Sequence, residues 1–227
     1  MAQASTAPVA FDVQHPEKLS RLLLLLKSFL GWLYVGIPHG IILYVYGILT
    51  NLVTLIAFFA ILITGRYPLG LFNFVVGYYR WGARVAAYLS LMTDKYPPFS
   101  TTTAMWQSAD PVTLQVPYPE RLSRWRVLLK LFLGWLYVGI PHGFVLFFYG
   151  IAVLVVLFVA WWAILFTSRF PLGLFNFVVR YFRWSARVQV YLALLRDEYP
   201  PFNGRPQPPP PLASPGFISE PEAGPDA

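Results

Sequence analysis

The stretch Leu22–Ile63, LLLLLKSFLGWLYVGIPHGIILYVYGILTNLVTLIAFFAILI, decides the fold of this chain. A close copy of it follows 103 residues later as Trp125–Phe166. Held as one helix, each run would be roughly 60 Å long, about twice the thickness of a bilayer's hydrocarbon core. We therefore predict that each run breaks and folds back as an apolar helical hairpin.

The expected turn of each hairpin is the motif Ile-Pro-His-Gly, at 37–40 and again at 140–143. Proline removes an amide donor and glycine relaxes the backbone, so both favour the end of a helix. We expect the histidines to cap exposed backbone at these turns. Metal ligation or a proton relay is the alternative, but no second histidine or carboxylate lies nearby in the sequence, and we predict no metal site. The predicted helix-break residues are Pro38, His39, Gly40, Pro141, His142 and Gly143.

Composition gives the class of protein. The chain is 57% hydrophobic and only 12% charged, with a mean hydropathy of +0.55, which is too apolar for a soluble domain of 227 residues. Its net charge of +7 comes from 17 Lys and Arg residues, none of which lies within 28–64 or 131–167. The cations therefore flank the apolar runs, which is typical of the cytoplasmic side of a membrane protein and not of nucleic-acid binding. The absence of cysteine excludes disulfides, thiolate nucleophiles and cysteine-ligated metals.

The duplication sets the domain organisation, because twelve consecutive residues from Phe29 to Gly40 recur unchanged in the second copy. We predict a disordered N-terminus at 1–7, a membrane repeat at 8–100, a linker at 101–110, a second repeat at 111–203 and a disordered proline-rich tail at 204–227. Residues 8–13 and 111–116 alternate weakly and are expected to be strands or extended lead-ins. The first helix of each copy is expected to begin at Pro16 or Pro119.

A further helix is expected in each copy, from Pro68 to about Thr93 in the first. Its polar residues recur at intervals of seven, four and four, which places them on one stripe of the helix. Arginines in hydrocarbon are unfavourable, so we expect this amphipathic helix to lie in the membrane interface. Anionic phospholipid is the expected partner of the stripe; pairing with Asp94, Asp197 or Glu17 and recognition of a specific ligand are the alternatives. The candidate lipid-binding residues are Arg66, Arg80, Arg84, Arg169, Arg180, Arg183 and Arg187.

The aromatic residues and the proline-rich tail can each be interpreted as a binding site or as a purely structural feature. The abundant tyrosines and tryptophans suit a pigment or quinone site, but an aromatic belt at the membrane surface explains them more simply, and we predict no cofactor. The tail segment 205–211 fits an arginine-plus-PxxP ligand, but any proline-rich tail produces this pattern by chance, and we favour a flexible spacer.

The order of several motifs resembles a known family. These motifs include Thr64-Gly65-Arg66-Tyr67-Pro68, Leu71-Phe72-Asn73-Phe74-Val75-Val76-Gly77 and Asp94-Lys95-Tyr96-Pro97-Pro98-Phe99. The chain looks like the bacterial membrane family known as domain of unknown function 4389, over nearly all of both copies. The second copy departs from the pattern at Ser168 and Arg196. The resemblance implies a bacterial integral membrane protein with the domain in tandem, and it supplies no activity or catalytic residue.

These observations predict an all-α integral membrane protein of two tandem pseudo-symmetric repeats, each a hairpin followed by an interfacial helix. Hairpins place the cations on one side, so we expect four spans in the inner membrane with both termini cytoplasmic. One span per copy, with inverted repeats, is the alternative. No combination of nucleophile, base and orienting group can be assembled, so we expect a non-enzymatic accessory subunit among other integral membrane subunits. A small transporter or channel with a path between the repeats, or a cofactor-bearing subunit, is the alternative.

Overall fold

The computed structural model describes residues 9–101 and 110–206. The predictions for residues 1–7, for most of the linker and for the proline-rich tail beyond 206 lie outside these ranges. The elements of the first repeat are β1 (Ala10–Val13), α1 (Arg21–Gly31), the π-helical turn η1 (Trp32–Gly36), α2 (Ile37–Thr64) and α3 (Leu69–Leu89). Those of the second are β2 (Val112–Gln115), α4 (Arg124–Gly134), the π-helical turn η2 (Trp135–Gly139), α5 (Ile140–Thr167) and α6 (Leu172–Leu192).

The predicted hairpins do not form. In each repeat one helix of 44 residues in total runs through the Ile-Pro-His-Gly motif without a break. These helices are Arg21–Thr64 and Arg124–Thr167. These are two helices that length and composition would allow to cross a membrane. Pro38, His39 and Gly40, like Pro141, His142 and Gly143, are therefore helical residues and not turn residues.

The helix tolerates its proline because the backbone groups there find other partners. In η1 the Ile37 amide donates to the carbonyl of Trp32, five residues back. Pro38 has no amide to offer the carbonyl of Tyr34, four residues back. The hydroxyl of Tyr96 donates to that carbonyl instead, at 3.2 Å. The same bond recurs at 3.2 Å in the second repeat, between Tyr199 and the carbonyl of Tyr137.

The long helices begin later than the prolines predicted. Ser20 caps α1 by accepting a hydrogen bond from the Leu23 amide, and its own amide donates to the Asp94 carboxylate at 2.6 Å. In the second repeat Ser123 and Asp197 make the corresponding two contacts. A side-chain acceptor at the first free amides is a stronger start signal than a proline four residues earlier.

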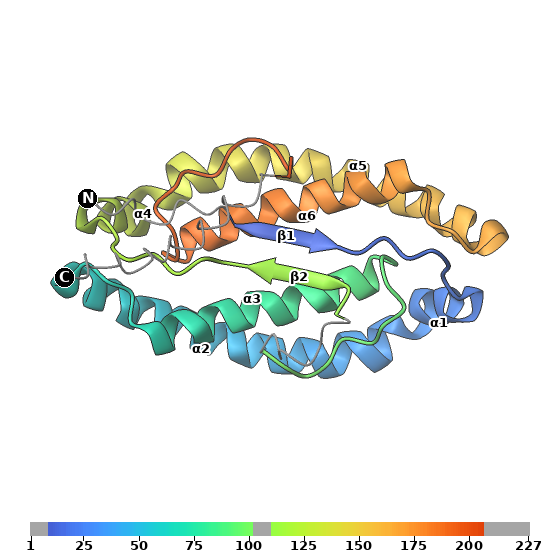
Figure 1. Cartoon of the computed structure of the whole chain (residues 1–227), viewed down its shortest axis with the longest axis horizontal. Helices are drawn as coiled ribbons and strands as arrows, with labels where there is room; N and C mark the ends of the chain where they lie inside the picture. Colours follow the sequence, from blue (N-terminus) through green and yellow to red (C-terminus); the bar gives the residue numbers. More distant parts are fainter. Residues whose placement is uncertain (1–8, 102–109, 207–227) are drawn as a thin grey trace, which may run out of the picture.

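The two repeats are related by a pseudo-two-fold axis. Strands β1 and β2 pair antiparallel, Ala10 with Gln115 and Val13 with Val112, which confirms the predicted strands. Each strand packs on the amphipathic helix of the other repeat, β1 on α6 and β2 on α3. The long helices run antiparallel and meet near their ends, α1 with α5 and α2 with α4. A half-turn in the plane of Figure 1 therefore brings one repeat onto the other.

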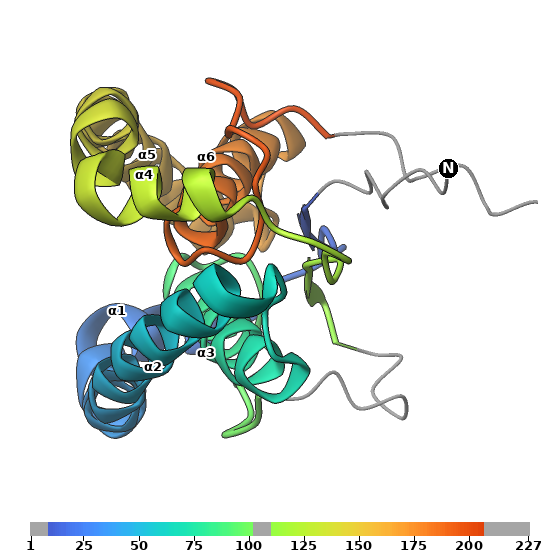
Figure 2. The ribbon, with the colours of Figure 1, turned by 90° about the vertical axis from the view of Figure 1, so that its left-hand side faces the viewer.

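The elements lie in three layers (Figure 2). The long helices form one outer layer, α3 and α6 form the middle layer, and the strands lie on the opposite side. The core joins the repeats, since the buried Tyr67 and Phe72 of one and Phe170 and Phe175 of the other belong to one hydrophobic cluster. The axis crosses these layers, so both repeats present the same layer to the same side.

Candidate functional site

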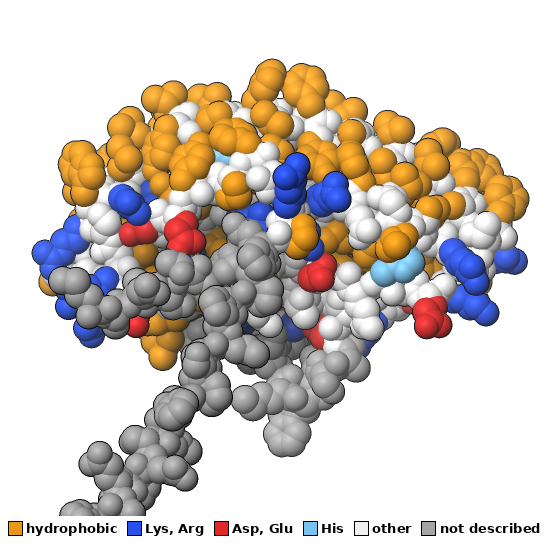
Figure 3. Space-filling model, turned by 45° about the horizontal axis from the view of Figure 1, so that its top comes forward, with side chains coloured by type: hydrophobic (Ala, Val, Ile, Leu, Met, Phe, Trp, Pro, Cys, Tyr) orange, Lys and Arg blue, Asp and Glu red, His pale blue; other side chains and the backbone are white. Residues whose placement is uncertain are grey.

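The outer layer of long helices exposes large apolar side chains over its whole length. Its exposed side chains begin at Leu22 and end at Ile63, both 76% exposed, and run from Trp125 to Phe166 in the second repeat. Large apolar side chains are exposed throughout these intervals. Figure 3 shows them gathered along the margin that α4 and α5 form. A continuous apolar surface of this length marks a site of contact with lipid or another protein.

Exposed cations lie at the two ends of this apolar face (Figure 3). The ends are built from both repeats, because Arg21 donates to the carbonyl of Phe166 at 2.8 Å and Arg124 donates to that of Ile63 at 2.8 Å. One end carries Lys18, Arg21 and Arg169, and the other carries Arg66, Arg121, Arg124 and Arg126. The predicted lipid-binding residues Arg66 and Arg169 are thus exposed beside the apolar face.

The arginine stripe of the amphipathic helices points inward, with one exception. Arg183 is buried, and it donates to the carbonyl of Phe11 at 2.8 Å and to the carboxylate of Asp12 at 3.0 Å. Arg80 donates to the carbonyl of Leu114 at 3.0 Å in the corresponding place. These two arginines therefore fix the strand that the other repeat contributes.

The next arginine along each helix holds the segment that ends its own repeat. Arg84 donates to the carbonyl of Ser100 at 2.9 Å and pairs with Asp110 at 2.6 Å. Arg187 donates to the carbonyls of Asn203 and Arg205 at 3.3 and 2.8 Å. Burial, together with the neighbouring cation of Arg183, lowers the pKa of Arg187 to about 10. The side chains of Arg84, Arg183 and Arg187 are buried and bonded to other groups of the protein. The expectation that they contact lipid is therefore wrong.

Arg180 is the exposed member of the stripe and replaces Gly77 of the first repeat. A Cβ at Gly77 would lie 2.8 Å from the Cβ of Thr101. In the second repeat the positions are reversed, because Gly204 stands where the first repeat has Thr101, and a Cβ there would lie 1.9 Å from the carbonyl oxygen of Arg180. Each repeat therefore has one glycine where the amphipathic helix approaches the end segment. The glycine is on the helix in the first repeat and on the end segment in the second.

Lys27 and Lys130, near the start of the long helices, are buried ion-pair partners. Lys27 donates to the carbonyl of Thr93 and to the Asp94 carboxylate, both at 2.7 Å, and its ammonium lies 4.2 Å from the centre of the Tyr88 ring. Lys130 and Asp197 pair in the same way. Asp94 and Asp197 thus neutralise lysines and not the arginine stripe. The spacing between lysine and aspartate is the same in both copies, and this pattern in the sequence could have predicted the ion pairs.

The predicted histidine caps are members of an aromatic cluster. The indole N–H of Trp81 donates to Nδ1 of His39 at 3.0 Å, so the proton of a neutral imidazole lies on Nε2. Nε2 contacts the Tyr96 hydroxyl at 3.1 Å, and Phe99 stacks on the ring at 3.9 Å between centroids. The tyrosine, and not the histidine, satisfies the free carbonyl.

The second repeat keeps this cluster with one bond fewer. Trp184 donates to Nδ1 of His142 at 3.0 Å and Phe202 stacks on it, but Nε2 has no partner among the described residues. The described residues also contain no group of three histidines or carboxylates able to hold a metal ion. The cluster therefore fixes the segment after α3 or α6 against the long helix.

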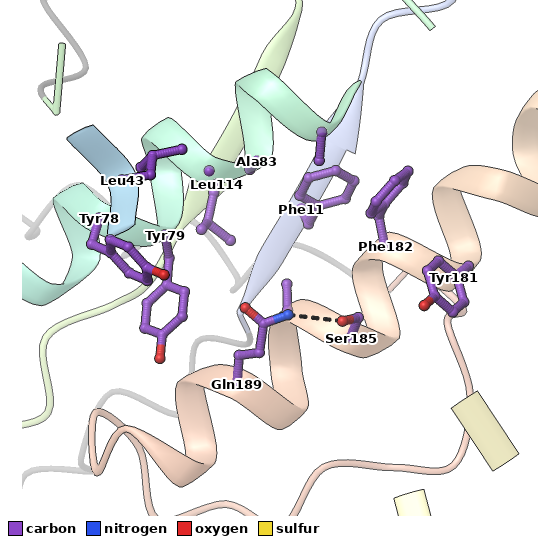
Figure 4. Close-up of a pocket in the computed structure, with 13 residues that line it drawn as sticks. Phe11, Leu43, Tyr78, Tyr79, Ala83, Leu114, Tyr181, Phe182, Ser185 and Gln189 are labelled. Carbon is purple, nitrogen blue, oxygen red and sulfur yellow. Dashed lines mark hydrogen bonds between the residues drawn. The ribbon is translucent and has the colours of Figure 1, made fainter. Parts of the chain in front are cut away.

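A cavity of about 290 Å³ lies between α3 and α6, on the pseudo-two-fold axis. Figure 4 shows Tyr78 and Tyr79 of α3 at one end and Tyr181 and Phe182 of α6 at the other. The strand residues Phe11 and Leu114 line one side. The polar groups of the lining belong to tyrosine, serine and glutamine, and none of the lining side chains is charged.

Comparison with known families gives a match in both repeats. The sequence model of the family described as Domain of unknown function (DUF4389) matches residues 21–101 and 127–203, one segment in each repeat. Neither the curated proteins nor the solved structures contain a match to the chain.

Proposed function

Given that the chain belongs to the family of domain of unknown function DUF4389 and carries the domain twice, we propose that it is a non-enzymatic membrane protein with a structural or accessory role. Its two long helices lie along the plane of one leaflet, with their apolar face among the acyl chains. The observation that carries this proposal is the exposure of apolar side chains over the full length of both helices.

Helix length favours this orientation over a crossing one. A helix of 44 residues is about 66 Å long, whereas the hydrocarbon core is about 30 Å thick. If the helices crossed the bilayer, about half of their exposed apolar side chains would lie in water or among headgroups. In the plane of the leaflet all of them lie at a similar depth.

The position of the pseudo-two-fold axis supports the same orientation. The long helices are antiparallel, so crossing would place their midpoints, the strands and the Arg183–Asp12 pair near the centre of the bilayer. Exposed strand edges and charges are unfavourable there. With the axis normal to the membrane, the apolar layer faces lipid in both repeats and the strand layer faces water.

Cations at both ends of the face suit anionic headgroups. We propose that Arg66 and Arg169, with the exposed cations beside them, contact these headgroups, and that the leaflet is the cytoplasmic one of a bacterial inner membrane. Arg80, Arg84, Arg183 and Arg187 would act indirectly, by holding the strands and the end segments. Other integral membrane subunits are proposed as partners along the apolar face.

Depth measurement tests the orientation. The chain has no cysteine, so single cysteines at Leu22, Ile41, Leu52 and Ile63 can carry a nitroxide label in reconstituted vesicles. Comparing relaxation by oxygen with relaxation by a water-soluble nickel chelate gives the depth of each label. We expect similar, shallow depths at all four positions. Depths that rise to a maximum between Ile41 and Leu52, with the two ends on opposite sides, would refute the in-plane orientation.

Vesicle binding tests the headgroup contact. Replacing Arg66 and Arg169 by glutamine should weaken association with vesicles that contain phosphatidylglycerol, and the loss should shrink at high salt. Replacing the exposed Gln14 and Gln115 by alanine on the strand side is the matched control and should change nothing. Equal binding of the arginine variant and the unmodified protein would remove the headgroup proposal.

A further inference from the structure

The cavity between α3 and α6 is built by both repeats. Tyr78, Tyr79 and Ala83 of α3 line it together with their counterparts Tyr181, Phe182 and Ala186 of α6, 103 residues later. The strand residues Phe11 and Leu114 are likewise counterparts. The cavity therefore lies where the two-fold axis passes between two helices that do not pack closely on each other.

Small residues keep this space open. Gly82, Ala83 and Ala86 of α3 face Ser185 and Ala186 of α6, so neither helix fills the gap. A volume of about 290 Å³ is far larger than the voids of ordinary protein interiors, and it approaches the size of small-molecule sites. A space with this largely apolar lining is filled favourably by an apolar group.

From its lining, we infer that the mouth of the cavity faces the layer of the long helices. The strands close the opposite side, because Phe11 and Leu114 come from β1 and β2. Leu43 of α2 is the lining residue from the long helices, and α5 contributes none within the described lining. The long helices meet near their ends, as α1 with α5 and α2 with α4, and between these contacts α2 and α5 run on either side of α3 and α6 (Figures 1 and 2).

We propose that this cavity binds one acyl chain of a glycerophospholipid from the leaflet. The inference rests on the proposed function, because it takes the open side of the cavity to face acyl chains. The aromatic and aliphatic lining suits a flexible polymethylene chain. Ser185 and Gln189, which hydrogen-bond to each other at 2.8 Å, are polar groups able to meet an ester or hydroxyl. Since no lining residue is charged, binding does not distinguish anionic from zwitterionic headgroups.

Photo-cross-linking tests this proposal on the full chain in vesicles. The probe is phosphatidylcholine with a diazirine at the end of one acyl chain, and mass spectrometry locates the cross-links. We expect cross-links on the apolar face and a second group on α3, α6 or Leu114 at the cavity. Replacing Ala83 and Ala186 by phenylalanine should remove the second group by at least tenfold and leave the first unchanged. The same substitution at the exposed Ala10 of β1 is the control and should change neither.

The possible results separate the two proposals. Cross-links on the apolar face without any at the cavity would overturn the acyl-chain site and leave the proposed orientation intact. An absence of cross-links on the apolar face would overturn the proposed function. If the phenylalanine variant does not fold, the cross-linking pattern of the unmodified protein alone decides between these results. A probe with phosphatidylglycerol in place of phosphatidylcholine should give the same ratio of cavity cross-links to cross-links on the apolar face; a severalfold change in this ratio would contradict the uncharged site.

Discussion

Removal of the Tyr96 hydroxyl tests how a proline is accommodated inside a long helix. The hydroxyl donates to the carbonyl of Tyr34, which Pro38 leaves without an amide, and it also contacts Nε2 of the fully buried His39. Replacing Tyr96 by phenylalanine keeps the ring and deletes both bonds. Leaving a buried or half-buried polar group without a partner costs about 1–3 kcal/mol. We expect Tyr96→Phe to lower the free energy of unfolding by about 2 kcal/mol, in line with this range.

The second repeat provides a matched comparison. Tyr199 donates to the carbonyl of Tyr137, but Nε2 of His142 has no partner to lose among the described residues. Tyr199→Phe should therefore cost about 1 kcal/mol, roughly half of the effect in the first repeat. Unfolding by sodium dodecyl sulfate in mixed micelles, followed by far-ultraviolet circular dichroism, measures both.

A double-mutant cycle with Pro38→Ala identifies the carbonyl as the cause. Alanine restores an amide within reach of the Tyr34 carbonyl, so Tyr96→Phe should then cost about 1 kcal/mol less than it does beside the proline. If Tyr96→Phe has the same effect with proline and with alanine at position 38, the hydroxyl does not replace the missing amide. In that case the tyrosine acts only by packing on the histidine.

Three other changes test the interior. Lys27→Met leaves a partly buried carboxylate without its cation and should destabilise the fold by about 3 kcal/mol, measured in the same unfolding assay, and an unchanged midpoint would contradict a stabilising ion pair. Gly204→Ala would place a Cβ 1.9 Å from the Arg180 carbonyl oxygen and should cost about 2 kcal/mol, whereas a neutral result would show that the end segment moves freely. Burial raises the pKa of Tyr67 to about 12, above the value near 10 of an unfolded chain, so its contribution is present below pH 10 and is lost between pH 10 and 12. Tyr67→Phe should therefore retain helical circular dichroism to higher pH, and superimposable alkaline profiles would refute this.

The sequence alone determined the features that depend on composition and local pattern. The duplication, the apolar character of 22–63 and its copy, and the amphipathic helices α3 and α6 are all readable from spacing, because a helix repeats its faces every few residues. The short alternation at 8–13 similarly indicated a strand. The family follows from the order of the motifs.

Only the tertiary structure decided how these segments combine. The local sequence around Pro38 predicts the end of a helix. In the structure Tyr96, distant in sequence, donates to the carbonyl that lacks an amide partner, and the helix continues. Charge placement suggested that the arginine stripe meets lipid, yet Arg183 fixes a strand of the other repeat. The exchange of strands and the cavity on the axis arise from contacts between residues that are 34 positions apart for Arg80 and Leu114 and 172 positions apart for Arg183 and Phe11. Local periodicity carries no information about such contacts, because their energy depends on which surfaces meet after the helices have formed.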